Sequence, residues 1–292
     1  MSDSSFAREN PATGVAATPA VAAPTSVAVR WISGVLLLVL VAGAVAAGGS
    51  LFVAVVAAAA AVGAWEFAGL AARLDARPPL WLLLPLTVWL AIRYAVPGSP
   101  PALDIGLGAG LVAGIVGLVA TGSSWRGWMA ALAGAVYVGF SLGYYVALLT
   151  WRPSDHRFGI AALAVPVAAV IVCDTAAYLV GSAFGRRPFF PQLSPRKSLE
   201  GAVAGLVGAV AIAAVLGAAY LGISPWVGAA EGLLVAVVAQ AGDLAESALK
   251  RQGGAKDSSN LIPGHGGLLD RLDSIVLVAP AVYCFYRLIS LA

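Results

Sequence analysis

The sequence predicts an all-α, polytopic integral membrane protein with about nine transmembrane helices. Of its 292 residues, 60% are hydrophobic and only 11% are charged, whereas soluble domains carry about 25% charged residues. Mean hydropathy is +0.91, and long apolar runs alternate with short charged clusters, as in helical membrane proteins. The net charge of +3 is too small for a nucleic-acid surface, so we expect a lipid bilayer and no nucleic acid as partner.

The elements follow in order along the chain. Residues 1–29 are rich in Ala, Pro, Thr and Ser and are expected to form a disordered cytosolic tail. The next apolar run follows this long tail and precedes more membrane segments, which favours a retained span over a signal peptide. Each run has roughly the 20 residues that cross about 30 Å of hydrocarbon. The predicted spans lie near residues 30–48, 51–72, 79–97, 104–121, 126–150, 159–184, 200–222, 226–250 and 270–290.

The two halves of the chain differ in polar content. Residues 30–150 are predicted to form N-terminal transmembrane helices. Residues 151–292 are predicted to form a C-terminal catalytic half with two cytosolic loops, 185–199 and 251–269. Both loops are rich in Gly, Pro, Ser and basic side chains, which suits the binding of anionic oxygens.

Basic residues predict the orientation in the membrane. With a cytosolic N-terminus, 13 of the 17 Lys and Arg residues fall on the inner side, as the positive-inside rule requires. We therefore expect a multi-pass protein of the cell inner (plasma) membrane. Its N-terminus and active site would face the cytosol, and its C-terminus would lie outside.

Acidic residues inside apolar spans indicate function, because a charge in lipid is costly. Asp243, Glu246 and Lys250 share one helix face, at offsets of three and seven, and Asp270 and Asp273 share another. Two such faces can converge on Mg²⁺, which favours carboxylate and phosphate oxygens. An intramembrane ion pair with Lys250 is the structural alternative. The other acids in spans are Asp174 and Glu66, and the role of Glu66 is left open.

The segment after residue 247 has the composition of a phosphate-binding loop. Lys250, Arg251 and Lys256 bring positive charge to the membrane face. The Pro and Gly residues at 263–267 let backbone approach a ligand closely. His265 lies between glycines and not on an apolar helix face, which favours a role in the site.

This segment resembles the signature of the phosphatidate cytidylyltransferase family, and two upstream blocks agree with it. The blocks are Asp174–Tyr178 with Gly181 and Phe184–Arg186, and Ser194–Gly201, where Ser198 replaces the usual Thr. Ser182 stands where the family often has a base, so one phosphate contact is absent or supplied by Arg186. The resemblance covers residues 170–275, and upstream it extends only to hydropathy and Trp65–Phe67. The matching signature positions are Ser247, Lys250, Arg251, Lys256, Asp257, Ser259, Pro263, His265, Gly266, Gly267, Asp270, Arg271 and Asp273.

The resemblance implies transfer of a cytidylyl group from CTP to phosphatidate, giving CDP-diacylglycerol and pyrophosphate. It implies Mg²⁺ on Asp243 and Asp270, with Asp273 and Asp174 as further candidates. Whether a second cation joins is left open. It also implies a homodimer. The residues expected to bind phosphate groups or substrate are Ser194, Lys197, Lys250, Arg251, Lys256 and Arg271, with Asp174 beside them and His265 orienting or protonating a phosphate.

Two other functions stay open at this point. An ion-coupled transporter could use intramembrane acids, although its acids would be spread across the depth of the bilayer. A related CTP-dependent lipid enzyme, such as a lipid kinase, would transfer the γ-phosphate instead of the nucleotide. Pyrophosphate release distinguishes these two kinds of transfer.

Overall fold

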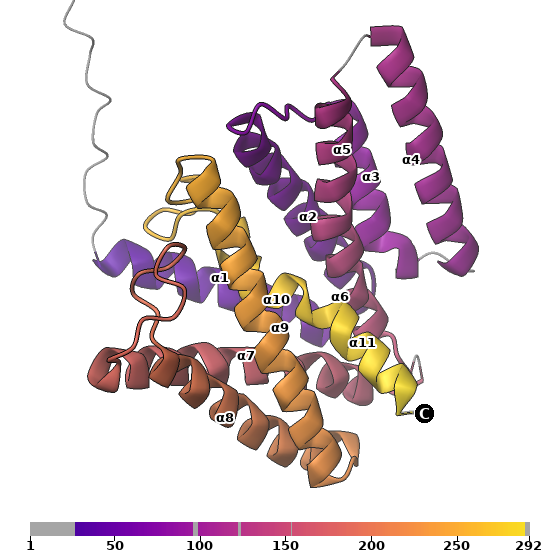
Figure 1. Cartoon of the computed structure of the whole chain (residues 1–292). Coiled ribbons are helices and arrows are strands. Elements are labelled where there is room, and N and C mark those ends of the chain that lie inside the picture. Colours follow the sequence, from indigo (N-terminus) through magenta and orange to yellow (C-terminus); the bar gives the residue numbers. More distant parts are fainter. Residues whose placement is uncertain (1–26, 96–98, 122–123, 153, 290–292) are drawn as a thin grey trace, which may run out of the picture.

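The computed structural model describes residues 27–95, 99–121, 124–152 and 154–289, and within these ranges it consists of helices and connecting loops (Figure 1). This confirms the predicted all-α class. The predicted tail, apart from its last three residues, lies outside the described residues. The helices are α1 (Val27–Ala47), α2 (Gly49–Ala72), α3 (Leu80–Ile92), α4 (Ser99–Thr121), α5 (Trp125–Gly134), α6 (Ser141–Leu149), α7 (His156–Phe184), α8 (Leu199–Leu216), α9 (Pro225–Gln252), α10 (Leu269–Val276) and α11 (Val278–Leu288).

Five helical segments of the described chain are long and apolar enough to cross a membrane. Three more apolar segments are shorter, at Trp31–Ala47, Leu80–Ala95 and Gly108–Ala120. The chain is therefore a helical membrane protein, while the number of nine spans stays a prediction. The five long segments are Gly49–Ala72, Trp125–Leu149, His156–Phe184, Leu199–Leu221 and Pro225–Gln252.

Local sequence explains where the long helices of the C-terminal half begin. Asp155 caps α7 by accepting from the backbone N–H of Phe158. Ser198 caps α8 through the N–H of Gly201, and Ser224 caps α9, which opens on a proline. Each side chain satisfies a backbone donor that has no partner within the helix.

The predicted ninth span is broken into two helices. α10 ends at Val276, and α11 begins at Val278 and runs at a different angle (Figure 1). Pro280 accounts for the break, because a proline has no N–H to donate to the carbonyl of Val276 four residues earlier. The break leaves the short α10 to carry Asp270 and Asp273 beside α9.

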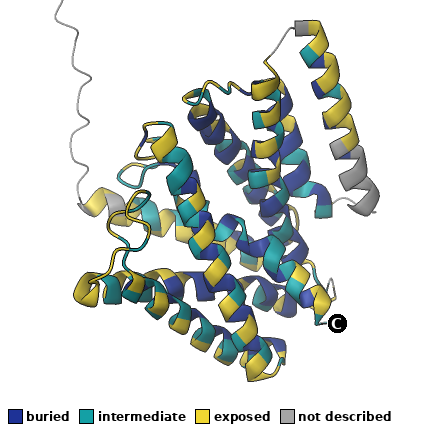
Figure 2. Cartoon of the chain, viewed as in Figure 1, coloured by how far each residue is buried: buried dark blue, intermediate teal, exposed yellow. Residues whose placement is uncertain are grey.

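Glycine allows α7 and α8 to lie close together along much of their length (Figure 1). A Cβ at Gly205 of α8 would lie 2.7 Å from the carbonyl oxygen of Cys173 on α7. One at Gly201 would lie 2.6 Å from the carbonyl oxygen of Ala177. α9 packs across both helices, and many outward faces keep exposed apolar side chains, as contact with lipid requires (Figure 2).

Candidate active site

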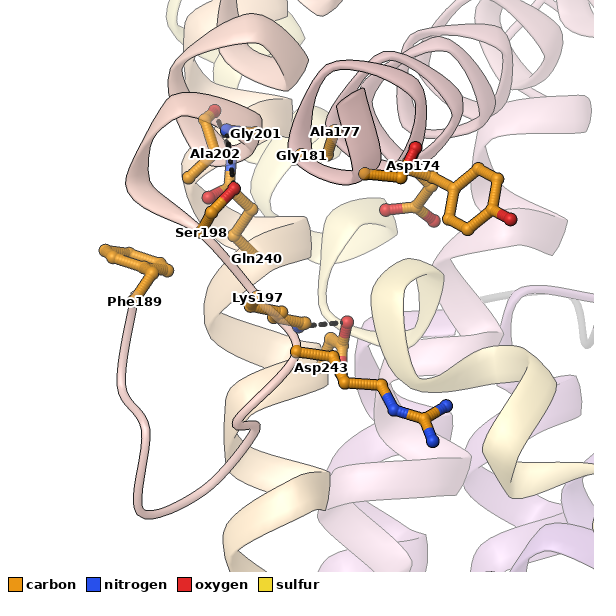
Figure 3. Close-up of a pocket in the computed structure, with 13 residues that line it drawn as sticks. Asp174, Ala177, Gly181, Phe189, Lys197, Ser198, Gly201, Ala202, Gln240 and Asp243 are labelled. Carbon is orange, nitrogen blue, oxygen red and sulfur yellow. Dashed lines mark hydrogen bonds and ion pairs between the residues drawn. The ribbon is translucent and has the colours of Figure 1, made fainter. Parts of the chain in front are cut away.

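A cavity of about 550 Å³ opens between α7, α8 and α9, under the loop that joins α7 to α8 (Figure 3). Its walls combine acidic, basic and amide side chains with small and aromatic residues. The lining residues come from α7, α8, α9 and the loop between α7 and α8, where the sequence analysis predicted polar site residues. The lining residues are Asp174, Ala177, Tyr178, Gly181, Ser182, Phe189, Arg196, Lys197, Ser198, Gly201, Ala202, Gln240 and Asp243.

An ion pair between Lys197 and Asp243 crosses this cavity (Figure 3). Lys197 comes from the loop before α8, and Asp243 comes from α9. Both side chains are partly exposed, at 31% and 25%. Asp243 also lies 3.4 Å from the hydroxyl of Ser247, one turn further along α9. The pair therefore joins the loop to α9 while both groups stay open to a ligand.

Other polar side chains fix the walls of the cavity. Gln240 of α9 donates to the carbonyl oxygen of Ala202 on α8, at 3.2 Å. Asp174 of α7 lines the same cavity (Figure 3) and lies within electrostatic range of Asp243 and Asp273. Asp174, Asp243 and Asp273 thus bring carboxylates from α7, α9 and α10 within electrostatic range of one another.

A second polar cluster lies one and two turns further along α9. The Nζ of Lys250 donates to Glu246 at 2.8 Å and to Asp270 at 2.7 Å. The other oxygen of Asp270 accepts from the backbone N–H of Ser258 and of Gly267, both at 2.8 Å, and from the Ser258 hydroxyl at 3.0 Å. Asp270 therefore accepts from Lys250 and from two backbone N–H groups, with the Ser258 hydroxyl also within reach. It joins α9 to the loop between α9 and α10, called the signature loop below.

The remaining predicted site residues lie outside the walls of the cavity between α7, α8 and α9. The Nδ1 of His265 lies 2.9 Å from the Ser33 hydroxyl of α1. Arg271 donates to the carbonyl oxygen of His265, from Nε at 3.2 Å and from Nη2 at 3.0 Å, which closes the loop on itself. Arg251 lies 3.4 Å from the carbonyl oxygen of Ala255.

Two more predicted residues stand on the loops. The carbonyl oxygen of Ser194 accepts from the N–H of Lys197, so Ser194 opens the turn that presents Lys197 to the cavity. Lys256 is exposed on the signature loop. The roles predicted for His265, Arg251, Lys256, Ser194 and Arg271 stay predictions.

The sequence-based prediction missed Gln240 and Ser258. Gln240 stands on the same α9 face as Asp243, three residues earlier, and that spacing was the available signal. Ser258 occupies a position that the signature leaves free, so the motif gave no signal for it. Its importance follows from its bonds to acids that are distant in the sequence.

The carboxylates around the cavity suit a hard divalent cation. Within the described ranges, no three His, Cys, Asp or Glu side chains are already close enough to hold a metal on their own. Mg²⁺ does not need such a set, because proteins bind it through one or two carboxylates together with substrate phosphates. Asp243 and Asp273, with Asp174 nearby, offer oxygens of this kind, whereas a cation at Asp270 would have to displace Lys250.

Comparisons with known proteins show which family this chain resembles. A model of the cytidylyltransferase family matches residues 28–289. The phosphatidate cytidylyltransferase of Brucella suis biovar 1 (strain 1330) is 42% identical over 176 residues, which are 60% of this chain and 63% of that protein. The phosphatidate cytidylyltransferase of Synechocystis sp. is 42% identical over 47% of each chain. That of Mycobacterium tuberculosis (strain ATCC 25618 / H37Rv) is 39% identical over 49% of this chain. The match thus spans less than two thirds of each relative.

Proposed function

Because the chain belongs to the cytidylyltransferase family, we propose that it transfers a cytidylyl group from CTP to phosphatidate. The products are CDP-diacylglycerol, a precursor for phospholipid biosynthesis, and pyrophosphate. The observation that carries this proposal is the cavity crossed by Lys197 and Asp243. Its lining comes from α9 and from the segments on α7 and α8 that resemble the family's polar blocks. The activity in the names of the relatives adds support.

The proposed reaction is an in-line displacement at phosphorus. A phosphate oxygen of the lipid attacks the α-phosphorus of CTP, and the bond from that phosphorus to the oxygen bridging to the β-phosphate breaks. Pyrophosphate leaves with the bonding electrons. A phosphate monoester has its second pKa near 6, so the nucleophile is already largely ionised at neutral pH and needs no general base. The protein then contributes position and neutralising charge.

Lys197 and Asp243 divide these tasks. Within the ion pair, each group neutralises the other. When the triphosphate enters, we propose that Nζ of Lys197 turns to a phosphate oxygen, which frees the carboxylate of Asp243. This exchange of ion-pair partners is favourable for partly exposed groups, because water lowers the free energy of either charge while it is unpaired.

We further propose that Asp243 and Asp273 hold Mg²⁺, with Asp174 as the next nearest acid. The hard oxygen donors on α7, α9 and α10 support this set. When bound, Mg²⁺ would supply positive charge that offsets the negative charge developing on the phosphate oxygens. The family resemblance also implies Asp270 as a ligand of Mg²⁺. We propose that Asp270 contributes through its ion pair with Lys250 and is free to bind the metal only when that pair opens. A second cation and a homodimer stay predictions.

The proposed place of the protein is the inner membrane, with the N-terminus and the loops 185–199 and 251–269 on the cytosolic side. This orientation rests on the distribution of basic residues. It lets CTP approach from the cytosol. The exposed apolar surface of α7 and α8, including Tyr178 at the cavity, supports arrival of the lipid from the bilayer.

Labelled CTP tests the proposal directly. Purified protein in detergent receives phosphatidate, Mg²⁺ and CTP labelled on either the α- or the γ-phosphate. We expect the α-label in the lipid phase as CDP-diacylglycerol, the γ-label in pyrophosphate, and loss of both products after chelation of Mg²⁺. Transfer of the γ-label to lipid would instead identify a lipid kinase. No transfer of either label would reject the proposal.

A further inference from the structure

Glu66 is a fully buried carboxylate of α2, 1% exposed, in the N-terminal half of the chain. Four donor groups lie within hydrogen-bond distance of it, and all come from the signature loop or the start of α10. One oxygen, Oε1, accepts from the Ser259 hydroxyl at 2.6 Å and from the N–H of Leu268 at 2.9 Å. The other, Oε2, accepts from the N–H of Leu269 at 2.6 Å and from the Ser258 hydroxyl at 3.2 Å.

These contacts make Glu66 the cap of α10. The first N–H groups of a helix lack partners within the helix, and negative charge is favourable beside them. α10 has no side-chain cap of its own at Leu268. Glu66 supplies that cap from another helix, about 200 positions earlier in the chain.

The same contacts connect Glu66 to the acids of the proposed site. The Ser258 hydroxyl lies within hydrogen-bond distance of both Glu66 and Asp270, although its single proton can be donated to one of them at a time. Asp270 in turn pairs with Lys250 on α9. The path from Glu66 to α9 therefore runs through Ser258 and Asp270.

Gly267 shows how closely the loop is seated on Glu66. A Cβ at this position would lie 2.7 Å from Oε1 of Glu66, too near for a real side-chain atom. The absence of a side chain at Gly267 thus lets the loop backbone lie between Glu66 and Asp270, whose Oδ2 accepts the N–H of Gly267.

We infer that Glu66 is a positioning residue, which caps α10 and seats the signature loop so that Asp270, Asp273 and Lys250 take their places. The effect of Glu66 on catalysis rests on the proposed cytidylyl transfer, whereas its capping of α10 does not depend on that proposal. Glu66 does not line the cavity between α7, α8 and α9, so its effect on catalysis is exerted through the loop and α10.

Backbone amide exchange in Glu66→Gln tests the inference without any assay of activity. The amide side chain keeps the shape but loses the charge and one pair of acceptor sites. We expect exchange at Leu268 and Leu269 to become at least about tenfold faster. The matched control is Glu231→Gln, which alters another buried glutamate of the membrane region, bonded to Tyr286. It should leave exchange at both amides unchanged.

Ser259→Ala provides a second variant in case Glu66→Gln does not fold. It removes one donor to Glu66 and should speed exchange at Leu268 by about threefold, since a hydroxyl contributes less than the charged acceptor. Unchanged exchange at Leu268 and Leu269 in whichever of these variants folds would overturn the inference.

Kinetics then connect the position of the loop to catalysis. Glu66→Gln should lower kcat at least about tenfold with KM for phosphatidate within about twofold, while Glu231→Gln leaves kcat within about twofold. If the wild-type protein transfers no cytidylyl group, the proposed function fails and amide exchange still decides the role of Glu66. If exchange rises in Glu66→Gln but kcat is unchanged, the capping stands and the effect on catalysis is rejected.

Discussion

Lys197 and Asp243 lie 46 positions apart in the sequence, yet their ion pair spans the candidate site. Both residues could be predicted as site residues from the sequence, because Lys197 stands in a Pro-containing basic loop and Asp243 in an apolar span. Their ion pair could not be predicted, since local sequence does not determine which distant carboxylate a lysine contacts. Glu66 illustrates the same limit more strongly. Its four donors lie in the other half of the chain.

The substitution Lys197→Ala tests the role of this single residue in binding CTP. We expect KM for CTP to rise about tenfold or more, because a charge-assisted hydrogen bond to phosphate is lost. The folded protein should remain intact, since the pair is partly exposed and contributes little to stability. Lys197→Arg keeps the charge and should stay within a few-fold of wild type. Steady-state kinetics that show unchanged KM and kcat in Lys197→Ala would remove this residue from the site.

At the scale of elements, the site depends on how closely α7 approaches α8. The positions of most helices followed from apolar runs and from capping residues such as Ser198 and Ser224. The sequence-based prediction did not resolve the break between α10 and α11, although Pro280 was visible, because a proline within a span can kink a helix without ending it. Pro166 lies within the unbroken α7 and illustrates this.

Gly205→Ala tests the close contact of the two helices. The new Cβ would lie 2.7 Å from the Cys173 carbonyl oxygen, so α7 and α8 must separate. We expect a loss of about 1–3 kcal/mol of stability, seen as a lower apparent Tm in detergent. Gly69→Ala is the control, because a Cβ there meets nothing within 4 Å. Equal Tm values for the two variants would show that this contact does not constrain the cavity.

At the scale of the whole molecule, the two halves of the chain are joined at the signature loop. The N-terminal half contributes Glu66 and Ser33, and the C-terminal half contributes the loop they contact. Composition and hydropathy predicted the fold class. The family resemblance predicted a candidate site in the C-terminal half. The contacts of the N-terminal half with the signature loop are visible only in the structure. The sequences of apolar helices in lipid give few signals of which helices they pack against.

We propose that cytidylyl transfer takes place in the cavity between α7, α8 and α9. Pyrophosphate release by purified Asp243→Asn, measured with CTP, phosphatidate and Mg²⁺, tests it most directly. The substitution keeps the size of the side chain but removes the charge that pairs with Lys197 and is proposed to bind Mg²⁺. We expect a folded protein whose rate of pyrophosphate release is at least about a hundredfold below that of the wild type. A folded Asp243→Asn protein that releases pyrophosphate at the wild-type rate would contradict it.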